Sequence, residues 1–124
     1  MAGNDIRARL LKQRGVLASQ KVKLSFGEVE VRELEEDRMD VIRDIAKREE
    51  GDEKAFMRLS VAESVYVDGD LLINKEFMDE AKEFNKNVLV KEIFKQGDTI
   101  KAFEVLMHLM GYGNADDEVE ELKN

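Results

Sequence analysis

A change in hydrophobic period near residue 34 constrains the fold of this chain more than any other feature. From Lys21 to Leu34 the sequence reads KVKLSFGEVEVREL, in which apolar and polar residues largely alternate. Alternation of this kind is typical of a β-strand with one buried face. After Leu34 the apolar residues recur at the spacing of an amphipathic helix. The sequence therefore predicts a β-hairpin followed by helices.

The predicted hairpin has two apolar runs separated by a glycine. We expect the turn at Gly27, because glycine is common at such connections. The buried face is expected to comprise Val22, Leu24, Phe26, Val29 and Val31. A two-stranded hairpin is marginally stable alone, so it must pack on another part of the chain.

Five helical segments are predicted after the hairpin. They run from residue 35 to Gly51, from about Glu53 to Tyr66, from a cap at Asn74 to about Phe84, from Val88 to Gly97, and from Asp98 or Thr99 to Gly111. A turn is expected at residues 67–70 and a break at residues 85–87. The predicted fold is mainly α (α+β), with a small N-terminal β-hairpin packed on a cluster of four to five helices.

The first three of these helices have apolar faces that can be read from the spacing. In the first the face is Leu34, Val41, Ile42, Ile45 and Ala46, with Met39 at its edge; in the second it is Ala55, Leu59, Ala62 and Tyr66; in the third it is Phe77, Ala81 and Phe84. The two alanines of the second helix predict the close approach of a neighbouring element.

Charge divides the 124-residue chain into three predicted parts. Residues 1–20 form a mobile basic lead-in, residues 21–113 a single helical domain with the hairpin, and residues 114–124 an acidic flexible tail. The first 23 residues hold six basic residues against one acid, and the last 11 hold five acids against one base. These end segments are either solvated arms or segments that attract neighbouring copies head to tail into a homo-oligomer.

The overall composition argues against several classes of function. A formal net charge of −8 disfavours binding to nucleic acid. No apolar stretch approaches the ~20 residues that span a bilayer, and the first residues lack the apolar middle of a secretion signal. The chain has no cysteine, which excludes disulfides and thiolate metal sites. We therefore expect no membrane association, and a protein that stays in the compartment where it is made.

No catalytic, cofactor or metal site is predicted. The only histidine, His108, shares a helix side with Lys101 and Glu104 and is expected to be solvated. Asp68-Gly69-Asp70 lacks the glycine and glutamate that a calcium loop needs at its sixth and twelfth positions. Gly111-Tyr112-Gly113 follows a helix, whereas a phosphate-binding loop introduces one. The chain is predicted not to be an enzyme.

The last helix offers the best candidate for a binding surface. Its apolar residues occupy more than half of the helix circumference, and methionine adapts to irregular partners. The predicted partner-binding residues are Phe103, Met107, Met110 and Tyr112. The alternative interpretation is that this broad apolar face belongs to the core.

The order of these parts resembles the tail assembly chaperones of phages and prophages of Gram-positive bacteria, of the PBSX-prophage type. The resemblance covers about residues 22–124. It is carried by the hairpin VKLSFGEVEVREL, by LSVAESVYVDGDLLINKEFMDEA, by VLVKEIFKQGDTIKAFEVLMHLMGYG and by the terminal DDEVEELKN. None of these pieces is a catalytic signature.

The resemblance implies a function in phage tail morphogenesis. Such proteins bind the aggregation-prone tape measure protein in the host cytoplasm, keep it soluble, and are absent from the mature virion. In many phages a −1 frameshift gives a longer form whose extension recruits tail tube protein. Leu122-Lys123-Asn124 can be encoded by an A-rich run on which ribosomes slip in this way. The alternative is a small acidic adaptor or regulatory domain that binds an amphipathic helix of another protein.

Overall fold

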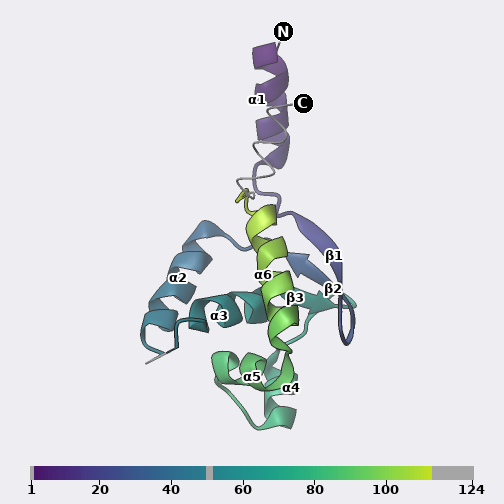
Figure 1. Ribbon diagram of the computed structural model, residues 1–124. Coiled ribbons are helices and arrows are strands. Elements are labelled where there is room, and N and C mark those ends of the chain that lie inside the picture. The colour runs from purple at the N-terminus through teal and green to yellow at the C-terminus, as the bar shows by residue number, and fades with distance from the viewer. Residues whose placement is uncertain (1, 50–51, 113–124) are drawn as a thin grey trace.

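The computed structural model of this chain describes residues 2–49 and 52–112 and shows an α+β fold, as predicted (Figure 1). Within these residues six helices and four strands follow one another. They are α1 (Ala2–Gln13), β1 (Ser19–Leu24), β2 (Gly27–Arg32), α2 (Glu36–Lys47), α3 (Ala55–Ser64), β3 (Val65–Val67), β4 (Asp70–Leu71), α4 (Lys75–Ala81), α5 (Lys86–Ile93) and α6 (Gln96–Leu109). No helix of the described residues is long and apolar enough to cross a membrane.

The predicted hairpin is present as β1 and β2, but it belongs to a larger sheet. The four strands are antiparallel and lie in the order β1-β2-β3-β4. The helix predicted from about Glu53 to Tyr66 is shorter in the structure, because α3 ends at Ser64 and the chain continues directly into β3. The turn expected at residues 67–70 is the connection between β3 and β4, where Asp68 and Gly69 have positive φ.

The hairpin turn lies two residues earlier than predicted. Leu24 pairs with Gly27, so Ser25 and Phe26 form the connection and Gly27 begins β2 with φ +144°. Phe26 was expected on the buried face, yet its side chain is 51% exposed. The alternation ends at Leu24, and the exposed Phe26 ring instead packs on the buried ring of Phe94, with ring centroids 5.2 Å apart.

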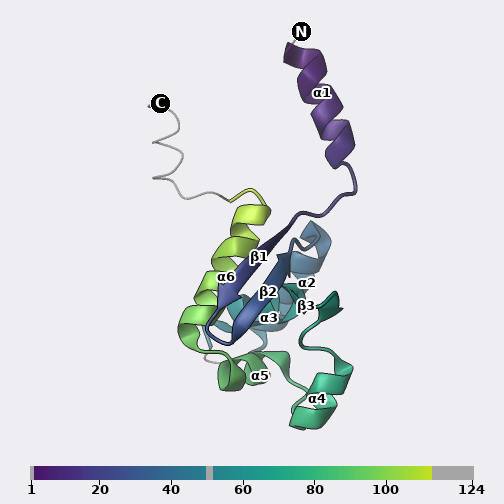
Figure 2. The ribbon, with the colours of Figure 1, turned by 90° about the vertical axis from the view of Figure 1, so that its right-hand side faces the viewer.

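The core lies between the sheet and the helices. Helix α6 packs against β1 and β2, while α3 contacts α2, α5 and α6 (Figures 1 and 2). The alanines of α3 allow this close approach as predicted, since Ala55 and Ala62 are fully buried. The main buried cluster comprises Val22, Leu24, Val29, Val31, Val61, Ala62, Val65, Ile73, Leu89, Val90, Phe94, Ala102 and Leu106.

Three predicted apolar faces need correction. In α2, Met39 and Ile42 are buried while Val41 is exposed, so the buried face is rotated toward the residue placed at its edge. Of the face predicted for α4, Phe77 is half-buried, whereas Ala81 is exposed and Phe84 lies beyond the end of the helix at 68% exposure. Tyr66 belongs to β3 and lies beneath the guanidinium of Arg32.

The predicted helix starts are confirmed at α4 and shifted at α5 and α6. The side chain of Asn74 accepts a hydrogen bond from the Phe77 N–H at 2.9 Å, which caps α4. Asn85 caps α5 in the same way, so the expected break is shorter and Asn87 is a buried residue of the helix. Helix α6 begins at Gln96, before the predicted Asp98 or Thr99.

The predicted lead-in contains helix α1. Every described side chain of α1 is exposed, and the helix projects away from the rest of the molecule (Figures 1 and 2). Gly15, with φ +73°, follows its end. The mobility of this segment stays a prediction, and the predicted acidic tail at residues 114–124 lies outside the described residues.

Candidate partner-binding surface

A groove lies between α2 and the C-terminal end of α6, with one residue of α3 between them. We call it the α2/α6 groove. It has a volume of about 290 Å³ and is lined by Glu36, Met39, Asp40, Arg43, Phe56, Met107, Met110 and Tyr112. Three of the four predicted partner-binding residues are in this lining, although residue spacing in α6 alone gave no reason to place them beside α2.

The floor of the groove is apolar. Met107 and Met110 are half-buried and pack against Met39, Ile42 and Leu59, which form a second buried cluster. Phe103, the fourth predicted residue, does not line the groove. Its ring contacts that of Phe56 edge-on, with centroids 5.9 Å apart and an interplanar angle of 82°. Phe103 therefore contacts the groove lining through Phe56, as part of the packing between α3 and α6.

The end of α6 is shaped so that Tyr112 reaches the groove. The N–H of Gly111 donates to the carbonyl of His108 at 3.0 Å, and the N–H of Tyr112 donates to that of Met107 at 2.9 Å. These two bonds, with Gly111 at φ +94°, form a Schellman motif. The motif reverses the chain, and Tyr112 then lies in the same lining as Met107 while remaining 66% exposed.

The rim on the α2 side is charged. Glu36 and Asp40 are exposed acids, and Arg43 pairs with Asp40 at 3.3 Å. The guanidinium of Arg43 also lies 5.1 Å from the centre of the Phe56 ring. An apolar floor with acidic groups on one edge is suited to the apolar stripe of an amphipathic helix with basic flanks.

The contribution of α2 and α3 to the groove was missed from the sequence. The sequence pattern puts Met39 at the edge of the apolar face of α2, and it gives no indication that Phe56 belongs to a binding surface. The signal was present in the composition, because Met39, Met107 and Met110 are three of the six methionines of the chain. Clustered methionine at a surface is a feature of adaptable binding sites.

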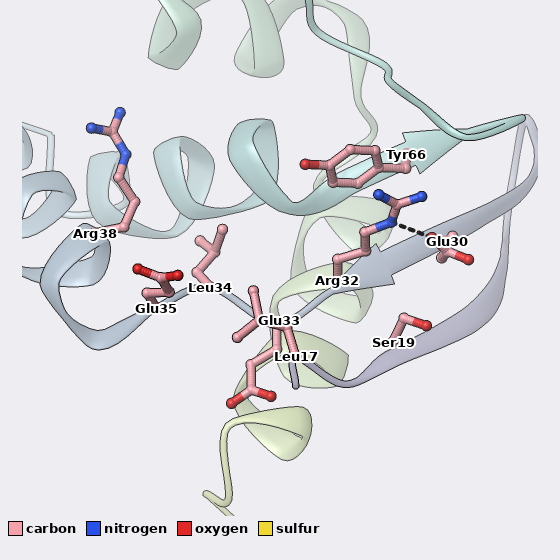
Figure 3. Close-up of a pocket in the computed structure, with 9 residues that line it drawn as sticks. All are labelled: Leu17, Ser19, Glu30, Arg32, Glu33, Leu34, Glu35, Arg38 and Tyr66. Carbon is pink, nitrogen blue, oxygen red and sulfur yellow. Dashed lines mark hydrogen bonds and ion pairs between the residues drawn. The ribbon is translucent and has the colours of Figure 1, made fainter. Parts of the chain in front are cut away.

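A larger hollow of about 740 Å³ lies beside the sheet and the start of α2 (Figure 3). Both of its cations are already paired with carboxylates. Arg32 donates to Glu30 and stacks 3.9 Å above the Tyr66 ring. Arg38 donates to Glu63 at 2.8 Å. The hydrogen bond from each arginine to its glutamate raises the pKa of that arginine. Both cations of this hollow therefore serve the fold.

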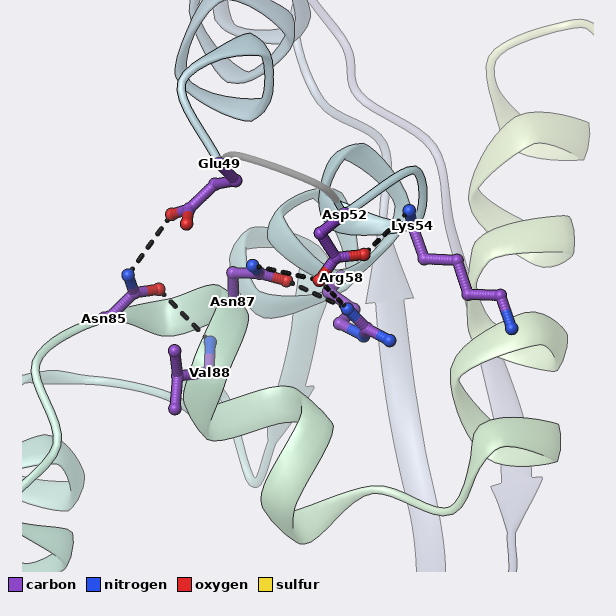
Figure 4. Close-up of polar contacts among 7 residues, drawn as sticks. All are labelled: Glu49, Asp52, Lys54, Arg58, Asn85, Asn87 and Val88. Atoms are coloured by element: carbon purple, nitrogen blue, oxygen red, sulfur yellow. Dashed lines mark hydrogen bonds and ion pairs between the residues drawn. The ribbon is translucent and has the colours of Figure 1, made fainter.

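A cluster of polar residues connects the start of α3 to α5 (Figure 4). Arg58 pairs with Asp52 and lies 3.4 Å from the Asn87 oxygen, while the backbone N–H of Lys54 donates to Asp52 at 3.0 Å. Burial alone raises the pKa of Asp52, but the Lys54 N–H, the Arg58 charge and Asn87 together lower it below its usual value. Asp52 thus orders the turn before α3, whose own N-cap residue is Lys54, and the cluster is structural.

The described residues provide no evidence of a catalytic or metal site. No group of three or more potential metal ligands occurs among residues 2–49 and 52–112. His108 is exposed, as predicted. The α2/α6 groove is the feature of the described surface best suited to binding another protein.

Comparison with known proteins agrees with the predicted resemblance. No curated protein and no solved structure matches the chain significantly. A model of the family described as phage XkdN-like tail assembly chaperone proteins matches residues 6–123, which is nearly the whole chain. This chain therefore belongs to the family of XkdN-like phage tail assembly chaperones.

Proposed function

We propose that this tail assembly chaperone binds the tape measure protein and keeps it soluble while the phage tail is built. The α2/α6 groove is the observation that carries the proposal. Long helical proteins aggregate when the apolar stripes of their helices are exposed, and a methionine floor accepts such stripes without requiring one fixed sequence. The groove is short, so several copies of the chaperone would be needed along a long client.

The rim of the groove defines which helices it binds best. Glu36 and Asp40 favour a stripe flanked by lysine or arginine, and repel one flanked by acids. Because these acids are exposed, their effect acts mainly on the rate of association and weakens as salt concentration rises. The apolar floor, formed by half-buried methionines, supplies the part of the affinity that salt does not screen.

Co-expression with the tape measure protein tests this proposal. Tyr112→Asp places a charge at a 66% exposed position of the groove, so the fold should persist while the soluble fraction of the tape measure protein falls severalfold. Phe84→Asp is the matched control, because Phe84 is 68% exposed and belongs to the connection between α4 and α5. These two helices lie far from the C-terminal end of α6 (Figure 1). Phe84→Asp should leave the client soluble.

A stronger variant of the groove is Met107→Asp with Met110→Asp. Both methionines also pack on the core, so circular dichroism and a denaturation curve must first show that this variant is folded. A folded double variant that still solubilises the client would exclude the groove as the binding surface. An unfolded one leaves the decision to Tyr112→Asp, where the side chain is mostly in solvent.

The proposed setting is the cytoplasm of the bacterial host, before the virion is complete. The chaperone would then be absent from the mature particle, and a −1 frameshift product would bring tail tube protein to the client. The slippage run is proposed at Leu122-Lys123-Asn124, outside the described residues. Reading the gene decides this: a leucine or lysine codon ending in G, or a stop codon at once in the −1 frame, removes the frameshift.

A further inference from the structure

Helix α1 is an amphipathic helix whose described side chains are all exposed. Its apolar residues Ile6, Leu10 and Leu11 are between 56% and 67% exposed. Ile6 and Leu10 are one turn apart and share a face, with Arg7 and Arg9 between them in sequence. An isolated helix of 12 residues is marginal in water, so α1 gains stability only from a surface that covers this face.

The charge of α1 differs from that of the remaining chain. Residues 1–18 contain four basic residues (Arg7, Arg9, Lys12 and Arg14) and one acid (Asp5), a net charge of +3. Because the whole chain carries −8, the remaining residues carry −11. A basic helix attached to an acidic body is attracted to the acidic surface of another copy of that body.

The α2/α6 groove is complementary to the apolar face and the basic residues of α1. Its floor of Met39, Met107 and Met110 is apolar and lies open to solvent on one side. Glu36, Asp40 and Arg43 line one edge, which keeps a net negative charge although Arg43 pairs with Asp40, and arginines that flank an apolar stripe would lie along it. The part of α2 that lines this edge runs from Glu36 to Arg43, about two helical turns, which is enough to face the turns of α1 that carry Ile6 and Leu10.

We infer that α1 of a second copy of this chain docks in the α2/α6 groove. Ile6 and Leu10 pack on the methionine floor, and the arginines of α1 face Glu36 and Asp40. The second copy is the source because α1 projects away from α2 and α6 of its own chain in both views (Figures 1 and 2). The two surfaces in contact are different, so the interface is heterologous, and self-association continues beyond a pair unless the two copies exchange their helices reciprocally.

Two groups of substitutions separate the two sides of this interface. The arm variant carries Ile6→Asp and Leu10→Asp, and the groove variant carries Asp40→Lys and Tyr112→Lys. All four positions are exposed, so both variants should fold. Phe84→Asp is the control for adding charge at an exposed apolar position elsewhere. Glu36→Lys, also at an exposed position, repeats the groove test at a different residue.

Sedimentation equilibrium of the full chain provides the measurement. Wild type and Phe84→Asp should have an average mass that rises with concentration above the 14.2 kDa of one chain. The arm variant and the groove variants should each remain at the mass of one chain. An equimolar mixture of the arm and groove variants should return to the mass of two chains, because one supplies an intact groove and the other an intact α1.

Other outcomes overturn the inference and identify the alternative. A mixture that stays at the mass of one chain shows that the interface does not join α1 to the groove. Association that persists in the arm variant places the interface elsewhere. A wild type that stays at the mass of one chain also overturns the inference that α1 docks on a second copy. Slow amide exchange in α1 would then show that α1 packs in the groove of its own chain. None of these outcomes bears on client solubility, so the proposed chaperone function is tested separately.

Discussion

Asp98 joins the hairpin turn to the first turn of α6. Its carboxylate accepts hydrogen bonds from the Ser25 backbone N–H at 2.9 Å and from the Ser25 hydroxyl, and the residue is buried. These hydrogen bonds from Ser25 lower the pKa of Asp98 below its ordinary value of 3.8. Position 98 is also close to the helix N-terminus, where a negative charge is favourable. One carboxylate therefore fixes the hairpin on the helix.

We predict that Asp98→Asn lowers the free energy of unfolding by about 1–2 kcal/mol at neutral pH, since hydrogen bonds to a charged group are lost. The folded-state pKa of Asp98 is below its unfolded value, so the stabilisation is present above pH 3.8 and is lost as the pH falls through the folded-state pKa. Urea denaturation should show the gap between wild type and variant closing in acid. A gap that does not change with pH would contradict this. Ser25→Ala should be non-additive with Asp98→Asn.

Gly111 has a positive φ that the end of α6 requires. At φ +94° an added Cβ would meet no atom within 4 Å, so the cost of a side chain there is in the backbone conformation. We predict that Gly111→Ala destabilises the fold by about 1 kcal/mol, with a smaller loss for Gly111→Asn, because asparagine tolerates the left-handed region better. Denaturation curves measure both. Equal losses for the two variants would argue against a backbone cause.

At the scale of secondary-structure elements, the hairpin was predictable and the rest of the sheet was not. The six-residue strands show a period of two that no helix shares. Strands β3 and β4 have three and two residues, which is too short for a period to appear. Val65 also continues the apolar composition of α3. Pairing with β2, a tertiary interaction, is what ends the helix at Ser64.

Only the α6 side of the candidate site could be predicted from the sequence. The broad apolar face of α6 indicated either core or interface; Ala102 and Leu106 are buried in the core, whereas Met107 and Met110 are half-exposed. The opposite wall depends on how α2 crosses α6. Periodicity within one helix contains no information on that crossing, so the groove could not be foreseen.

Helix α1 contributes helix content without contributing to the core. A chain that begins at Gly15 should therefore lose helical circular dichroism, while its free energy of unfolding changes by no more than about 0.5 kcal/mol at a concentration where the full chain is dissociated. Ala18 keeps its hydrogen bond to the Glu33 side chain in this truncation. A larger loss would mean that α1 packs on its own body, in contradiction to the extended position that the structure shows.

At the scale of the whole molecule, the outer face of the sheet is charged, whereas the floor of the α2/α6 groove is apolar. The sheet face outside the core carries charged cross-strand neighbours, Lys21 opposite Glu30 and Lys23 opposite Glu28. Lysine on the edge strand β1 disfavours pairing with a further strand. Association through this face of the sheet is thus opposed, whereas the α2/α6 groove is an apolar surface open to other chains.

If α1 of a second copy and the client use the same groove, they must compete. A tape measure segment with an apolar stripe and basic flanks should dissociate the self-associated wild type. The arm variant Ile6→Asp/Leu10→Asp should bind that segment at a lower concentration than wild type does, because its groove is free. Phe84→Asp should behave as wild type.

Titration of a fluorescent client segment at fixed chaperone concentration measures the difference. Its size should grow with chaperone concentration, since occupation of the groove by α1 follows mass action. A weaker affinity in the arm variant would contradict competition and would show that α1 itself contacts the client. Equal affinities at every concentration would show that the groove is empty before the client binds. The concentration dependence therefore separates a chaperone that protects its own groove from one that keeps the groove open.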